Sequence, residues 1–191
     1  MGRLLTTAAL LAALLASPVL AACSGDGGAS MPTPSPTPTS TSPTASPTPQ
    51  PPAMPEAARA HTPEGAEAFV RHFWAVVDYG RETLDTEPIR ALSRSDCKGC
   101  LGGIRALGEI RKHGGRIRGG QTTISELKAT GLKAGDQVFY DVTFLHTNAP
   151  EITDYPGTDR DVERDRVTKP TRMRLFSIEE GWEVAQLGPA Q

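Results

Sequence analysis

Between Thr62 and Arg81 the apolar residues recur at the spacing of one helix face. They are Ala66, Phe69, Val70, Phe73, Trp74 and Val77. Such a stripe is typical of an amphipathic helix that packs against a core. Thr62, Pro63 and Glu64 supply a hydroxyl cap, a proline at the first helical position and an acid in the first turn. We therefore predict a helix from Thr62 to about Arg81.

Two further helices are indicated in the next thirty or so positions of the pattern. A short helix begins near Thr86 and carries Ile89 and Leu92. A longer helix runs from about Cys97 to Lys112, and Ser95 or Asp96 is placed to cap it. The pair Gly114-Gly115 after a basic last turn predicts where this helix ends.

After Gly120 the pattern changes to short alternating runs, which predict the strands of an antiparallel sheet. The runs are Gln121–Thr130, Asp136–Thr147, Val167–Glu179 and Gly181–Leu187. The second run is apolar on both faces, so we predict a central strand with helix on one side and a hollow on the other. Asn148 to Arg166 is rich in charge, Gly and Pro and predicts a long mobile loop.

Helices followed by strands, instead of alternating with them, predict an α+β fold. Three N-terminal helices would pack on one antiparallel sheet of about four strands. Residues 62–191 are enough for a single domain with its own core. We place a signal peptide in residues 1–22 and a disordered linker in residues 23–61.

The N-terminus has the three parts of a secretory signal in order: the positive Arg3, an apolar run from Leu4 to Leu15, and small residues before Cys23. Leu20-Ala21-Ala22-Cys23 resembles the lipobox of bacterial lipoproteins. The resemblance implies cleavage between Ala22 and Cys23 and acylation of Cys23. Two acyl chains would hold the protein on the outer face of the cytoplasmic membrane. An ordinary cleaved signal and a retained transmembrane anchor remain as alternatives.

From Met31 to Pro55 the chain has 25 residues, of which ten are Pro and ten are Ser or Thr, and none is charged. Such a segment cannot bury apolar surface, and it favours a solvated polyproline II spacer. O-glycosylation and docking of the Pro-rich segment to an aromatic groove are the alternatives.

The charge balance argues against nucleic acid as a partner, because 20 Lys and Arg residues stand against 22 Asp and Glu residues. A local basic run lies around the end of the third predicted helix. Its members are Arg105, Arg111, Lys112, His113, Arg116 and Arg118. It forms either a solvated helix face followed by a turn or a contact for anionic lipid or cell-wall polymer.

Three cysteines are present, and lipidation of Cys23 leaves the close pair Cys97 and Cys100. We favour a structural disulfide, because an exported domain meets an oxidising environment. A redox pair would sit after a strand, as in thioredoxin, but the residues before Cys97 indicate helix and loop. A structural zinc site needs four ligands, and no second Cys or His pair is present.

Several short motifs resemble those of an actinobacterial lipoprotein family of unknown function. They are Thr62-Pro63-Glu64-Gly65-Ala66 with Phe69, Leu92-Ser93 before Asp96-Cys97-Lys98-Gly99-Cys100, Gly114-Gly115-Arg116-Ile117-Arg118-Gly119-Gly120, and Gly181-Trp182-Glu183-Val184. The order of elements also resembles the cone-shaped fold of nuclear transport factor 2-like proteins. The resemblance implies a curved sheet around a pocket, and it brings no activity.

Tyr140, Asp141, His146 and Trp182 are the candidate pocket residues. Acid-base chemistry in a cone fold needs a carboxylate or histidine inside an apolar pocket, a place for Asp141, or for Tyr140 with His146. The sequence does not show which strand face points inward. The four histidines lack the spacing of metal ligands, and no cofactor is indicated. We therefore expect a non-catalytic domain that binds a small apolar ligand or a cell-envelope protein. The rival hypotheses are a small isomerase, lyase or hydrolase and a redox protein that uses the cysteine pair.

Overall fold

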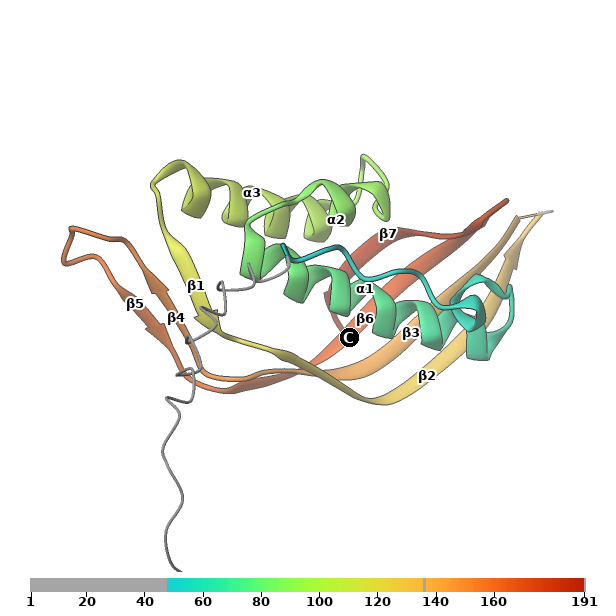
Figure 1. The fold of residues 1–191 in the computed structure, drawn as a ribbon. Helices are drawn as coiled ribbons and strands as arrows, with labels where there is room; N and C mark the ends of the chain where they lie inside the picture. The colour runs from blue at the N-terminus through green and yellow to red at the C-terminus, as the bar shows by residue number, and fades with distance from the viewer. Residues whose placement is uncertain (1–47, 136, 191) are drawn as a thin grey trace, which may run out of the picture. The chain divides into compact units, whose positions relative to one another are not determined.

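The computed structural model of the chain describes residues 48–135 and 137–190 (Figure 1). The predicted signal peptide, Cys23 and most of the predicted linker lie outside the described residues. In chain order the elements are a 3-10 helix η1 (Glu56–Arg59), helices α1 (Pro63–Thr83), α2 (Glu87–Ala91) and α3 (Lys98–Lys112), and strands β1 (Arg116–Gly119), β2 (Thr122–Ala134), β3 (Gln137–Asn148), β4 (Glu151–Asp154), β5 (Val162–Arg164), β6 (Val167–Ile178) and β7 (Gly181–Pro189). The fold is α+β, as predicted.

The main sheet is antiparallel, with the strand order β2-β3-β6-β7. β3 is an inner strand, which agrees with its apolar residues on both faces. Tyr140, Val142 and Phe144 are buried on the face toward the helices. Asp141 and Thr143 lie on the opposite face, where Thr143 is exposed. No helix in the described part of the chain covers that outer face, so the predicted hollow beside β3 is open sheet surface (Figure 1).

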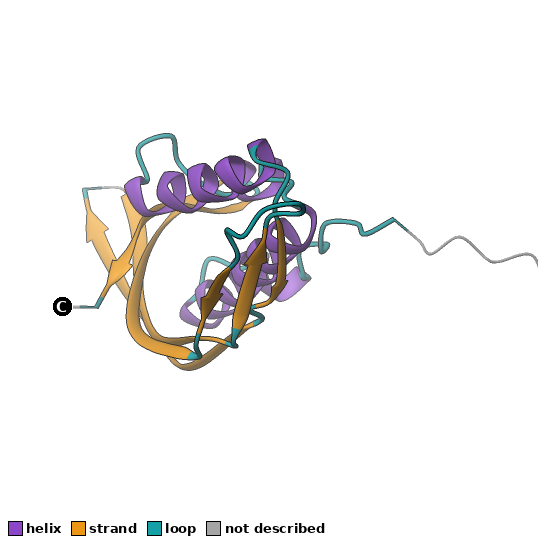
Figure 2. Cartoon of the chain, turned by 90° about the vertical axis from the view of Figure 1, so that its left-hand side faces the viewer, coloured by secondary structure: helices purple, strands orange, loops and turns teal. Residues whose placement is uncertain are grey.

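A second, smaller antiparallel sheet has the order β1-β4-β5. Its strands continue three strands of the main sheet: β1 runs into β2, β3 into β4, and β5 into β6. The prediction of a loop over Asn148 to Arg166 was therefore wrong, because β4 and β5 lie within it. Figure 2 shows the long strands bending around the side on which the helices lie. The helices lie on the concave side of this bend.

The three helices match the predicted ones closely. The Thr62 hydroxyl caps α1 by accepting a hydrogen bond from the Gly65 N–H at 3.1 Å. The cap of α3 differs from the prediction, since neither Ser95 nor Asp96 supplies it. Instead the Cys97 sulfur accepts a hydrogen bond from the Cys100 N–H at 3.3 Å.

The folded part begins earlier than residue 62, the predicted boundary. Ala58 in η1 is fully buried, and Met54 packs against the core. His61 bonds through Nε2 to the Gly181 carbonyl at 2.9 Å and accepts a hydrogen bond from the Tyr140 hydroxyl at 3.4 Å. The end of the predicted linker, from Met54 onward, is thus part of the domain because its few apolar side chains reach the core.

Side chains of α1 hydrogen-bond to the backbone of β2, one of the two edge strands of the main sheet. Glu67 accepts from the Ala129 N–H at 3.1 Å, and Asp78 accepts from the Thr122 N–H at 3.0 Å. Arg71 donates to the Ile124 carbonyl at 3.1 Å. These bonds fix α1 along β2 and occupy backbone groups that β3 does not use.

Candidate functional site

A pocket of about 320 Å³ lies between α1, α3, β1 and the ends of β4, β5 and β7. Most of its wall is apolar. Phe73, Trp74 and Val77 come from α1, and Ile104, Leu107 and Ile110 come from α3. The apolar residues of α1 and α3 therefore enclose a space between the two helices. The exposed residues Gly103 and Ala106 of α3 also line it, so the opening lies beside this helix.

One end of the pocket is charged. Glu151, at the start of β4, accepts hydrogen bonds from Arg81 of α1 and from Arg164 of β5, the latter at 2.9 Å. The side chains of Glu151 and Arg81 are 7% and 16% exposed, whereas that of Arg164 is 56% exposed. We refer to these three residues as the arginine cluster. It has a buried end at Arg81 and Glu151 and a solvent-facing end at Arg164.

The break between β1 and β2 makes room for this cluster. Gly119 and Gly120 have positive φ angles of 76° and 75°, which favour glycine. A Cβ atom on Gly120 would lie 2.6 Å from Glu151 Oε2 and 2.7 Å from Arg81 Nη2. The Gly119-Gly120 pair thus turns the chain between the two sheets and leaves space for the buried ion pair.

Cys97 and Cys100 form the predicted disulfide, with their Cα atoms 5.3 Å apart. Both residues are buried, and Cys100 lines the pocket. Between them, Gly99 approaches β7 so closely that a Cβ atom would lie 2.0 Å from the Leu187 carbonyl oxygen. The Cys97–Cys100 segment therefore attaches the first turn of α3, and with it one wall of the pocket, to the main sheet.

Tyr140 and Trp182 lie together in the core and not in the pocket. Their rings are edge to face with centroids 5.2 Å apart, and His61 packs on Trp182 at 5.0 Å. Tyr140 is 8% exposed and Trp182 is 2% exposed. The two candidate pocket residues thus anchor the segment before α1 to the end of the main sheet.

His146 stacks on Trp74 with ring centroids 3.9 Å apart. Burial lowers the pKa of His146, and the nearby Arg81 cation lowers it further. His146 lines a separate hollow of about 280 Å³ under β6 and β7, which shares Trp74 and Leu187 with the larger pocket. His146 therefore contacts the pocket wall through Trp74.

Asp141 lies on the opposite face of β3 from Tyr140 and His146. Both of its carboxylate oxygens accept hydrogen bonds at 2.7 Å from Arg174 of β6. These bonds and the Arg174 charge lower the pKa of Asp141. A carboxyl group that acts as an acid near neutral pH needs a raised pKa, so this geometry holds Asp141 as an ionised structural partner of Arg174.

The basic run at the end of α3 is mostly paired with acids of the same domain. Arg116 and Arg118 contact Asp154 at 3.3 and 2.9 Å, and Lys112 and His113 contact Glu109. Residues 48–135 and 137–190 contain no group of three or more His, Cys, Asp or Glu side chains that could hold a metal ion. Within the same described ranges, no helix has the length and hydropathy needed to cross a membrane.

The arginine cluster was not predicted from the sequence. Arg81 appeared there as the end of the first predicted helix, and Glu151 and Arg164 lay in the segment predicted to be a loop. The local signal that marks this region is the Gly119-Gly120 pair, which was noted within a motif without a structural role.

The comparisons with known proteins support a fold and a family. The intermembrane space region of the chloroplast protein ARC6, known from a crystal structure, superposes with a TM-score of 0.50 at 13% sequence identity. The alignment covers 68% of this chain and 97% of that one, and at this identity it shows similarity of fold alone. No curated protein matches the sequence. A protein-family model, the family of unknown function DUF6318, matches residues 37–186. The chain therefore belongs to the DUF6318 family.

Proposed function

We propose that the chain is a lipid-anchored protein of the outer face of the cytoplasmic membrane whose folded domain binds a small apolar ligand. The support for the anchor is Leu20-Ala21-Ala22-Cys23, which resembles a lipobox and stands after an apolar segment of signal type. The Pro-, Ser- and Thr-rich segment that follows would serve as a spacer between the acylated Cys23 and the domain.

The observation that carries the binding function is the apolar pocket between α1 and α3. Its volume of about 320 Å³ falls within the range of small-molecule sites, and most of its wall is apolar. An unfilled apolar space reduces stability, because the side chains around it lose packing contacts. A ligand that fills the space restores those contacts. The pocket also has an opening, since Gly103 and Ala106 line it and are exposed.

Two neighbouring glycines of α3 allow a matched test. Gly103 lines the pocket and Gly102 does not, and a Cβ atom on either would meet no atom within 4 Å. We expect wild-type protein to bind an uncharged dye whose fluorescence rises in apolar surroundings. Gly103→Phe should abolish this signal by filling the pocket, whereas Gly102→Phe should retain it. Circular dichroism would confirm that both variants are folded. Equal dye binding by the two folded variants would contradict the assignment of the pocket.

A further inference from the structure

We infer that the pocket takes a single-chain amphiphile with an anionic head group, which Arg81 and Arg164 bind while the apolar chain lies between α1 and α3. This inference rests on the proposed function and adds the chemical class of the ligand to it. The arrangement that points to it is an apolar pocket with the arginine cluster at one end.

The charge at that end is positive. Arg81, Glu151 and Arg164 are the ionisable groups in the described lining of the pocket, so two cations stand against one anion. A ligand carboxylate or phosphate would balance the remaining positive charge. A ligand ammonium group would add a third cation beside two guanidinium groups, and the apolar wall would strengthen that repulsion because it excludes water.

The cluster also has hydrogen-bond donors to spare. A guanidinium group has five N–H donors. Arg164 uses Nη1 for Glu151 and for the Thr153 hydroxyl, at 2.9 and 3.2 Å. Arg81 Nε is buried and has no hydrogen-bond partner among the residues that the structure describes. A ligand group that binds the N–H groups of Arg164 other than Nη1 must accept hydrogen bonds, as an anionic oxygen does.

The position of the cluster fits a head group better than a role in stability. A buried ion pair stabilises a fold little, because the loss of hydration offsets the attraction between the charges. Glu151 and Arg81 are nevertheless kept buried at the pocket, while Arg164 extends into solvent. An amphiphile whose apolar end enters between α1 and α3 would place its head near Arg164, where water also reaches.

The experiment compares four ten-carbon ligands by displacement of the bound dye from the purified full chain: decanoate, decyl phosphate, decanol and decylammonium. We expect both anions to bind about tenfold more tightly than decanol, since each gains charge-assisted hydrogen bonds. We expect decylammonium to bind more weakly than decanol. The tighter of the two anions would identify the head group as carboxylate or phosphate.

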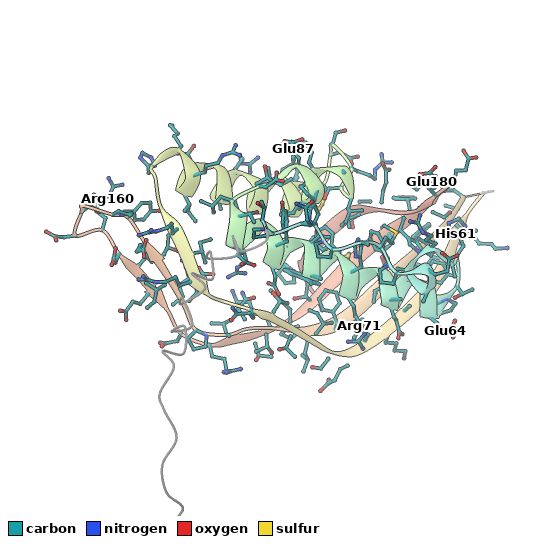
Figure 3. The ribbon with its side chains drawn as sticks, viewed as in Figure 1. His61, Glu64, Arg71, Glu87, Arg160 and Glu180 are labelled. Carbon is teal, nitrogen blue, oxygen red and sulfur yellow. A yellow bond between two sulfur atoms is a disulfide. The ribbon has the colours of Figure 1, made fainter. Side chains whose placement is uncertain are left out.

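Variants of Arg164 in β5 and of Arg160 in the loop between β4 and β5 test the role of the cluster. Arg164→Gln should remove most of the preference for anions over decanol. Arg160→Gln is the matched control, because Arg160 lies over the Tyr155 ring (Figure 3) and does not line the pocket. Equal binding of decanol and the anions, or equal effects of the two substitutions, would overturn this inference and leave the pocket in place. Failure of the dye and of all four ligands to bind would instead overturn the proposed function.

Discussion

Gly99 lies where α3 meets the main sheet, and a single methyl group there should destabilise the protein. A Cβ atom on Gly99 would lie 2.0 Å from the Leu187 carbonyl oxygen and 3.1 Å from Leu187 Cβ. The carbonyl belongs to β7, which pairs with β6 on its other side, so the first turn of α3 must move outward by more than an ångström. That shift would loosen the packing of Cys100 and Ile104, which are 3% and 5% exposed.

The expected change in the free energy of unfolding follows from two opposing effects of the substitution. Replacing a helical glycine by alanine stabilises a helix by about 0.5–1 kcal/mol when the new methyl group meets nothing. Overpacking a well-packed site costs about 1–3 kcal/mol. We therefore expect Gly99→Ala to lower the free energy of unfolding by about 1–2 kcal/mol. Gly102→Ala, in the same helix with no atom within 4 Å, should raise it by about 0.5–1 kcal/mol.

Urea denaturation followed by far-ultraviolet circular dichroism would measure both variants against wild type. The comparison cancels helix propensity, because the two substitutions are chemically identical and lie three positions apart. If Gly99→Ala is as stable as Gly102→Ala, Gly99 does not pack tightly against the Leu187 carbonyl. The attachment of α3 to the main sheet would then need another explanation.

Three other predictions concern the disulfide, the partly buried His146 and the anchor. Replacing both Cys97 and Cys100 by Ser should lower the free energy of unfolding by about 2 kcal/mol, the value for so short a loop, and an unchanged urea midpoint would contradict a structural bridge. The pKa of His146 is lowered in the folded protein, so the unfolded chain binds more protons as the pH falls below about 6.5. Stability should therefore decrease between pH 7 and pH 5, and His146→Gln should show a shallower decrease; identical slopes would rule out a contribution from His146. Cys23→Ser should move the chain from the membrane fraction to the soluble fraction, and a variant that stays membrane-bound and is still cut after Ala22 would refute lipid anchoring.

The long helices and strands of the domain could be predicted from the sequence because side chains on the same face recur at the regular spacing of a helix or a strand. The stripe from Ala66 to Val77 repeats with the helical period, and β3 alternates with a period of two residues. Their ends were predicted within a few residues. The inner position of β3 could also be predicted from the sequence, because a strand that is apolar on both faces is typical of the interior of a sheet.

The second sheet could not be predicted in this way. Its strands have three or four residues, which is too short for a period to show. β1 pairs with β4, and the contact from Arg116 to Asp154 spans 38 positions. The register of these strands is set by the long strands that they continue, so it depends on the completed main sheet. Their charged residues also gave the segment the composition of a loop.

The same distinction applies to the site. The disulfide between Cys97 and Cys100 could be predicted from their close spacing together with the oxidising environment that an exported domain meets. Arg81, Glu151 and Arg164 come from three elements, and each looks like an ordinary surface residue in its own segment. The Asp141 hypothesis depended on which face of β3 points inward, and tertiary packing decides that face. The pocket itself arises because α3 is held at its first turn, so its length extends over a space that α1 does not fill.

The hydrogen bonds between α1 and β2 affect how readily the protein aggregates at high local concentration. An outer strand with free backbone groups is a template on which another chain can add a strand, the first step of many aggregation processes. Here the Ala129 and Thr122 N–H groups and the Ile124 carbonyl already have side-chain partners on α1. A foreign strand would have to displace Glu67, Asp78 and Arg71 before it could pair along β2. The helix that forms one wall of the pocket thereby also hinders strand addition along the part of β2 from Thr122 to Ala129.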